Sequence, residues 1–408
     1  MDTSASALDT EAKSNPRLKL FERIFVRLIE ISDSSCLRIE FPGKRVIYLG
    51  NSNLPTEDLK IEDARFFRTV FLGGDVGFGE AYVNGLWSTT NLSGLLLLLA
   101  RKQDQTKRLH NLASFLTQLC NRFYHMKRSN TLAGSKQNIQ AHYDLSNEFY
   151  KSFLDPTMTY SSALFIEKSD SLEQAQINKI DRMLDLAQVK AGDSILEIGT
   201  GWGALATRAA LRGCRVKTIT LSEKQYSFAK KQFEAAGVAG QIELCLQDYR
   251  TLEGQFDAVL SCEMIEAVGK PYLESYFKIV QQSLKPGGKA VIQAITISND
   301  RYEAYSRQCD WIQKHIFPGG HLPSLGAIRS HVSKASGLKV LGVDSFGKDY
   351  AETLRRWAKR FNANESRIRE LGFDFAFRRK WNYYLSYCEA GFDAEMIDVN
   401  HVTLERSK

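Results

Sequence analysis

The sequence predicts a doubly wound α/β domain with a seven-stranded sheet, preceded by a smaller α+β domain. Residues 194–203 read S-I-L-E-I-G-T-G-W-G, a short apolar strand followed by glycines at alternate positions. Beyond this stretch, apolar strand-like runs alternate with amphipathic helical segments, which is typical of a parallel sheet. The chain has 408 residues, more than a single hydrophobic core usually accommodates, so we expect a second domain.

The smaller domain is expected at residues 16–100, after a disordered tail at residues 1–15. A basic amphipathic helix is expected from Pro16, with an apolar stripe that includes Phe21, Ile24 and Phe25. Such a helix either packs on its own domain or lies on a membrane surface. Further strands are expected at residues 36–41, 45–49 and 66–71, and the glycines of residues 73–79 are interpreted as turns before a helical run that reaches Trp87.

Residues 101–135 are interpreted as a basic helical linker, because their only acidic residue is Asp104. Apolar residues recur there at helical spacing. Two interpretations stay open: a helix attracted to an anionic bilayer, or a solvated helix packed on a neighbouring domain.

The bulk composition excludes several classes of protein. No apolar run reaches the ~18 residues of a membrane span, and the polar N-terminus lacks the apolar core of a signal peptide. The seven cysteines show no C-x-x-C spacing, so we expect a reducing compartment, no disulfides and no metal site. The net charge of +7 is compatible with an anionic partner. Nucleic acid is not expected, because the chain lacks a dense basic groove with interleaved aromatics.

The larger domain is expected at residues 136–408. Its first strand ends in the glycine turn. The other expected strands lie at residues 215–221, 242–246, 256–262, 289–295, 338–343 and 397–404. The expected helices lie at residues 171–186, 223–236 and 272–284, and over most of 350–390.

The carboxyl ends of the first strands are expected to form a nucleoside pocket. Glu197 precedes Gly199 and Gly201 in a G-x-G-x-G turn, and an acid there suits a ligand with a cationic end, such as S-adenosylmethionine. The alternative is a tight turn without a ligand. The next strand ends supply groups for a ribose (Thr220, Ser222 and Gln225) and for an adenine (Asp248 and Tyr249). Each of these residues would otherwise be a strand-end or helix cap.

Nearly the whole chain resembles the cyclopropane-fatty-acyl-phospholipid synthases and their mycolic-acid and plant relatives. The motifs that carry the resemblance are H-Y-D-L-S-N-E-F-Y (142–150), L-D-P-T-M-T-Y-S (154–161), E-I-G-T-G-W-G (197–203), T-L-S-E-K-Q (220–225), Q-D-Y-R (247–250), E-M-I-E-A-V-G (263–269), I-F-P-G-G-H-L-P-S (316–324) and F-G-K-D-Y (346–350).

This resemblance implies a class I methyltransferase (Rossmann-like) domain and an N-terminal lipid-binding domain. It implies a carbon transferred from S-adenosylmethionine to the cis double bond of an unsaturated phospholipid acyl chain, through a carbocation that then loses a proton. The alternative is an enzyme that leaves a methylene- or methyl-branched chain. The resemblance also implies a homodimer, peripherally associated with the inner, cytoplasmic membrane surface, and it assigns Tyr160 and Ser161 to the cofactor site.

In the resembled family a bicarbonate ion is thought to take the proton. By position its binding residues become Ser162, Glu266, Gln293, Ile295 and Tyr350. Ser162 and Gln293 depart from the family's Cys and His, although a hydroxyl and an amide can still donate hydrogen bonds to an anion. From the residues alone, Glu266 is equally a helix N-terminal acid and Tyr350 a core aromatic.

Overall fold

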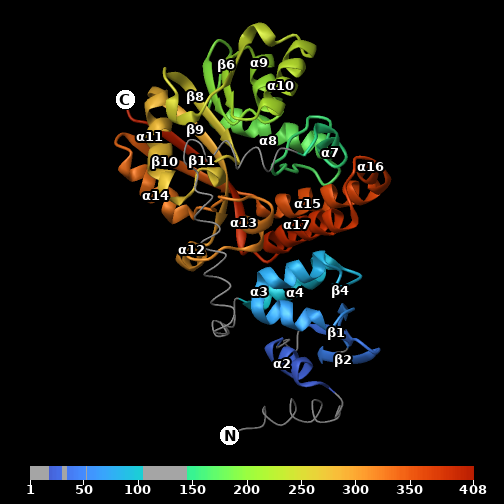
Figure 1. Cartoon of the computed structure of the whole chain (residues 1–408). Helices are drawn as coiled ribbons and strands as arrows, with labels where there is room; N and C mark the ends of the chain where they lie inside the picture. Colours follow the sequence, from blue (N-terminus) through green and yellow to red (C-terminus); the bar gives the residue numbers. More distant parts are fainter. Residues whose placement is uncertain (1–17, 30–34, 52, 104–144) are drawn as a thin grey trace. The chain divides into compact units, whose positions relative to one another are not determined.

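The computed structural model describes residues 18–29, 35–51, 53–103 and 145–408, and the chain divides into two compact units at residues 117/118 (Figure 1). The expected tail at 1–15, the expected linker beyond residue 103 and residues 142–144 of the first motif lie outside the described residues. Among the helices of the described ranges, none is both long and apolar enough to cross a bilayer.

The N-terminal unit combines a small mixed sheet with helices, as the sequence predicts. The sheet has the order β2-β1-β3-β4; β1 is antiparallel to β2 and parallel to β3. Phe25 packs edge-on against Phe66, with ring centroids 5.0 Å apart, so the first helix contributes to this core. The elements are α2 (Leu20–Leu28), β1 (Cys36–Phe41), β2 (Arg45–Gly50), β3 (Thr56–Ile61), α3 (Arg65–Val83), β4 (Trp87–Ser88) and α4 (Leu92–Gln103).

The strand predicted at residues 66–71 is wrong, because these residues open helix α3. The apolar residues Phe66, Phe67, Val70 and Phe71 follow the i, i+1, i+4, i+5 spacing of a helix face, which the high content of β-formers obscured. The glycines after them also lie within α3, which bends at Gly74 with φ +56°. A Cβ on Gly77 would lie 2.3 Å from the Thr69 carbonyl oxygen, so only glycine permits this packing.

The larger unit contains the predicted seven-stranded sheet, in the order β10-β11-β9-β8-β5-β6-β7. β11 is antiparallel to both neighbours and the remaining pairs are parallel. The strands are β5 (Ser194–Ile198), β6 (Arg215–Thr220), β7 (Ile242–Leu246), β8 (Phe256–Cys262), β9 (Leu284–Ile297), β10 (Leu338–Ser345) and β11 (Ile397–Arg406).

Helices cover both faces of this sheet. Along β5 the side chains alternate: Ile195 packs under α8 and α9, whereas Leu196 packs under α11 and α14. The helices are α7 (Asn147–Lys151), α8 (Leu172–Leu186), α9 (Ala204–Leu211), α10 (Glu223–Ala235), α11 (Leu273–Ser283), α12 (Asn299–Tyr305), α13 (Trp311–His315), α14 (Leu325–Lys334), α15 (Gly347–Ala363), α16 (Glu365–Glu370) and α17 (Phe375–Asp393), with 3-10 turns η1 (Ala239–Gln241), η2 (Tyr249–Thr251), η3 (Ile265–Ala267) and η4 (Lys270–Tyr272). The sequence did not predict α12 to α14.

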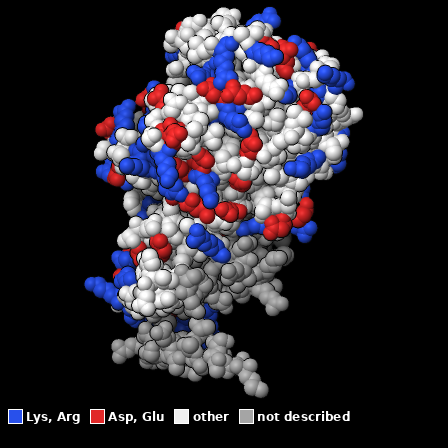
Figure 2. Space-filling model, turned by 180° about the vertical axis from the view of Figure 1, so that it is seen from behind, with Lys and Arg blue, Asp and Glu red and all other residues white. Residues whose placement is uncertain are grey.

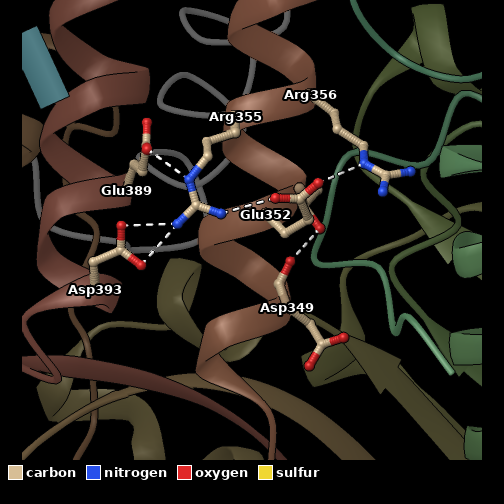
Figure 3. A network of polar contacts seen from close by, with 7 residues as sticks. Asp349, Glu352, Arg355, Arg356, Glu389 and Asp393 are labelled. Carbon is tan, nitrogen blue, oxygen red and sulfur yellow. Dashed lines mark hydrogen bonds and ion pairs between the residues drawn. The ribbon is translucent and has the colours of Figure 1, made fainter. Parts of the chain in front are cut away.

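An ion-pair network joins α15 to α17 (Figure 3). Arg355 of α15 contacts Glu389 at 2.9 Å and Asp393 at 2.8 Å, both on α17. Glu352 accepts from Arg355 and from Arg356 on the same helix. Because α15 carries Tyr350 and α17 carries Tyr384, the network fixes two tyrosines that approach the site described below.

The surface of the described residues carries both signs of charge. On the face in Figure 2, basic and acidic side chains are interspersed over the larger unit. This pattern differs from the continuous basic stripe typical of nucleic-acid-binding proteins.

Candidate active site

A cavity of about 180 Å³ opens at the carboxyl ends of β5, β6 and β8. Its walls come from the glycine turn, from the segment before α8 and from residues 262–264, which precede η3. Of the predicted cofactor-site residues, those that line it are Tyr160, Ser161, Glu197, Gly199, Gly201, Thr220, Gln225 and Tyr249. The cavity thus brings together eight of the ten residues that the sequence analysis assigned to the cofactor.

The glycine turn places backbone at the cavity without side chains. Gly199, Gly201 and Gly203 have φ of +103°, +54° and +98°, in the left-handed region that favours glycine. A Cβ on Gly203 would lie 2.7 Å from a ring carbon of Phe233, so this glycine serves helix packing. A Cβ on Gly201 would meet no protein atom within 4 Å, so it would project into open space instead.

Glu197 is a buried carboxyl in the cavity wall, 2% exposed. It accepts a hydrogen bond from Thr218 Oγ1. Burial raises its pKa to about 8, against the smaller lowering effects of Thr218 and the Lys179 ammonium. A cationic ligand group beside it would favour the ionised form.

At the end of β6, Thr220 Oγ1 donates to Gln225 Oε1 at 2.8 Å, and both residues line the cavity. Ser222 does not line it; its hydroxyl caps α10 by accepting from Gln225 N. Asp248 does not line it either, because both carboxylate oxygens accept from the Arg250 guanidinium. For these two residues the capping alternative describes the observed geometry.

Lys179 is a site residue that the sequence analysis missed. It lies on α8, is 1% exposed and lines the cavity. Its Nζ donates to Ser161 Oγ at 2.7 Å and to Cys262 Sγ at 3.4 Å. In the sequence, Lys179 falls on the same helical face as the buried residues of α8, and this spacing could have predicted its burial.

Glu263 is a second missed residue and the centre of a buried cluster. It follows β8, lines the cavity and has φ +48°. Its Oε1 accepts from Ser162 N at 2.8 Å and from Gln293 Nε2 at 2.7 Å, and its Oε2 accepts from Tyr350 Oη at 2.7 Å. Three residues predicted to hold an anion thus hold a carboxylate of the chain itself.

The other two predicted catalytic residues contact each other. Glu266 Oε1 accepts from Ile295 N at 2.6 Å, while its buried Oε2 has no partner among the described residues. Burial, and secondarily the charge of Glu263, raise the pKa of Glu266 to about 8. Glu266 does not line the cavity.

His401 on β11 contacts the side chain of Gln293. Its Nε2 lies 2.9 Å from Gln293 Oε1, which orients the amide nitrogen toward Glu263. Burial lowers the pKa of His401 to about 3, so the imidazole is neutral and its N–H can donate to the amide oxygen.

The residues present fit a nucleoside ligand with a cationic end. Gly201 leaves a cradle that a Cβ would fill, Glu197 supplies an acid, and Thr220, Gln225 and Tyr249 supply polar and aromatic contacts. In residues 18–29, 35–51, 53–103 and 145–408 no group of three or more His, Cys, Asp or Glu is arranged to hold a metal ion.

The chain is similar to known proteins in sequence and in structure. The family model described as mycolic acid cyclopropane synthetase matches residues 131–402. Tuberculostearic acid methyltransferase UfaA1 of Mycobacterium tuberculosis is 42% identical over 82% of this chain and 79% of its own length. Cyclopropane-fatty-acyl-phospholipid synthase of Escherichia coli is 32% identical over 87% of this chain and 89% of its own. The structure of mycolic acid cyclopropane synthase CmaA1 with SAH and CTAB superimposes with a TM-score of 0.61, at 29% identity, over 66% of this chain and 98% of that chain.

Proposed function

The chain belongs to the mycolic acid cyclopropane synthetase family of S-adenosylmethionine-dependent methyltransferases, and we propose that it converts unsaturated phospholipid acyl chains to cyclopropane chains. The observation that carries the proposal is the cavity. It combines polar groups suited to a nucleoside at the ends of β5 and β6 with the partly buried carboxylate of Glu263 at the end of β8. A pocket with a negative group in its wall suits a carbocation that must lose a proton.

The chain's residues divide the work along the cavity. S-adenosylmethionine, when bound, supplies an electrophilic methyl group. Glu197 would hold its cationic end, Thr220 and Gln225 its ribose, and Tyr249 its base, with Gly201 allowing close backbone approach. The ring of Tyr160, held by a 2.9 Å hydrogen bond to Tyr384, offers an aromatic face to positive charge on the acyl chain.

A methylene- or methyl-branched product is the second candidate, favoured by the 42% identity to a tuberculostearic acid methyltransferase. Both products begin from the same cation, and they differ in the proton that leaves. The test is mass spectrometry and proton NMR of lipids from a host expressing the chain. Cyclopropane methylene protons resonate upfield of other alkyl protons, and their absence beside a branched product would reject ring closure.

The affinity for S-adenosylmethionine is expected to rise with pH between about 6 and 8 and then level off. The pKa of Glu197 is raised to about 8 in the free protein, so a cationic ligand must first displace its proton. Each pH unit below this pKa should weaken binding by up to ~10-fold. Calorimetry at pH 6, 7 and 8 measures this, with Glu197→Gln as the variant that should bind weakly at every pH. Equal affinity of the wild type across this range would contradict the role of Glu197.

We propose that an anionic phospholipid surface is the partner of the N-terminal unit. Leu20 and Phe21 on α2 are 62% and 59% exposed, while Phe25 faces the core. Arg23 and Arg27 are exposed on the same helix. Apolar side chains flanked by exposed arginines suit the headgroup region of a bilayer. A homodimer, as the resemblance implies, is a further prediction that light scattering in solution would check.

The triple variant Leu20→Asn, Phe21→Asn, Ile24→Asn is expected to lose most binding to liposomes of anionic phospholipid. Salt should weaken the wild-type binding, because charges are screened over roughly 8 Å at physiological ionic strength. Co-sedimentation of the full chain measures both effects. Leu211→Asn, which changes a 60% exposed leucine on α9 of the other unit, is the matched control. Wild-type binding that ignores lipid charge and salt would count against the proposal.

A further inference from the structure

Glu263 has an unusual backbone conformation for a residue other than glycine. Its φ of +48° lies in the left-handed region, where a non-glycine residue is strained. The backbone is fixed there because Glu263 N donates to Gln293 O at 2.9 Å, across from β9. The consequence is that the side chain reaches the cavity wall while its carboxylate meets three donors.

The hydrogen bonds around Glu263 favour an ionised carboxylate. On balance burial raises the pKa of Glu263, although Tyr350, Ser162, Lys179 and Gln293 all act in the opposite direction. Glu266 has a single donor on Oε1 and an unpartnered Oε2 within the described structure, and the neighbouring charge raises its pKa further. Glu263 therefore has three donors that stabilise an ionised carboxylate, whereas Glu266 has a single such donor within the described residues.

The two oxygens of Glu263 are not equivalent. Oε1 accepts two hydrogen bonds, which occupy its lone pairs, whereas Oε2 accepts one from Tyr350. Oε2 therefore keeps a lone pair that can take a proton. The glutamate also lines the same cavity as Glu197, which is proposed to hold the cofactor's cationic end.

We propose that Glu263 is the catalytic base, whose Oε2 takes the proton from the carbon newly added to the acyl chain, and that turnover needs no bicarbonate. This inference rests on the proposed function. One C–H bond of the added carbon breaks, and its electron pair forms the last ring bond and cancels the positive charge of the cation. The proton converts the carboxylate to a neutral acid, which releases it to solvent after the product leaves.

The donors that contact the Glu263 carboxylate would bind a free anion if that carboxylate were absent. Ser162 N, Gln293 Nε2 and Tyr350 Oη converge on one carboxylate, and a free carboxylate or bicarbonate presents similar oxygens. Removing the Glu263 side chain should recreate an anion site. Gly is compatible with φ +48° at this position, so the backbone should tolerate Glu263→Gly.

Two variants test the inference in the full chain. Glu263→Gln, which keeps the shape, is expected to lower turnover by ~100-fold or more at unchanged S-adenosylmethionine affinity. Glu263→Gly is expected to lose turnover similarly and to recover ~10-fold or more with millimolar formate or bicarbonate. Calorimetry gives a readout apart from activity: formate should bind Glu263→Gly and not the wild type. Asp257→Asn, at a partly buried carboxylate that pairs with Lys285 near the amino end of β8, is the matched control and should keep wild-type turnover.

The outcomes separate the inference from the function. Wild-type activity that vanishes in bicarbonate-depleted buffer, or full activity of Glu263→Gln, overturns the inference alone. A Glu263→Gly variant that binds S-adenosylmethionine normally but neither binds formate nor recovers with it also overturns the inference. Failure of the wild type to form S-adenosylhomocysteine with any unsaturated phospholipid overturns the proposed function, and the inference with it.

Discussion

Gly201→Val is expected to weaken S-adenosylmethionine binding ~100-fold while leaving the protein folded. The space beyond its Cα contains no protein atom within 4 Å, so a valine side chain enters the cavity without displacing the core. There it would occupy volume that the ligand needs in a cavity of only about 180 Å³. The φ of +54° adds strain for a β-branched residue. The backbone strain lowers stability rather than affinity, and a steric cost of roughly 3 kcal/mol in the cavity would weaken binding ~100-fold.

The control must carry the same backbone strain outside the cavity. Gly237 follows α10 with φ +69°, and a Cβ there also meets nothing within 4 Å. Gly237→Val should therefore lose a comparable amount of stability and retain the affinity of the wild type. Thermal unfolding and calorimetry of both variants give the comparison. Wild-type affinity in Gly201→Val would show that the cofactor does not bind at this turn.

The sheet was predictable because its signals are local. Each parallel strand is a buried apolar run, and Gly199 and Gly201 mark the turn that a ligand site requires. The strand predicted at residues 66–71 is wrong. Its aromatic and β-branched composition favours a strand, whereas the spacing of its four apolar residues favours a helix. Only the packing of Phe66 and Phe67 on Phe25 decides between them.

The residues that would act in the reaction were harder to predict than those that line the proposed cofactor site. Glu263 and Glu266 lie three residues apart, and sequence alone does not tell which one faces the cavity. The turn after β8, with Glu263 at φ +48°, decides it. Likewise, the sequence analysis assigned Asp248 to the adenine. Its ion pair with Arg250, two residues away, depends on side-chain geometry that the sequence does not show. Lys179 was hidden among the charged residues of an amphipathic helix.

Tyr350→Phe is expected to lower turnover by roughly 10- to 100-fold with S-adenosylmethionine affinity unchanged. Tyr350 Oη is the donor to Glu263 Oε2, and a hydrogen bond to a charged group contributes about 1.5–3 kcal/mol. Its loss raises the pKa of Glu263, which the Lys179 ammonium, Ser162 N and Gln293 Nε2 still lower and the adjacent Glu266 also influences. A smaller fraction of the carboxylate is then ionised at neutral pH. The phenylalanine ring keeps the stacking on Phe392, at 4.5 Å between centroids, so the fold should survive.

The pH profile distinguishes this effect from simple loss of packing. Because the ionised carboxylate is the active form, turnover falls as the pH drops through its pKa, and the variant's profile should move to higher pH. Activity of Tyr350→Phe should thus recover partly in alkaline buffer, a response that a misfolded site would not give. Tyr302→Phe, which removes a hydroxyl 3.2 Å from His321 Nε2 outside the cavity lining, supplies the control with the wild-type profile. A uniform fall at all pH values would show that Tyr350 does not act through the charge of Glu263.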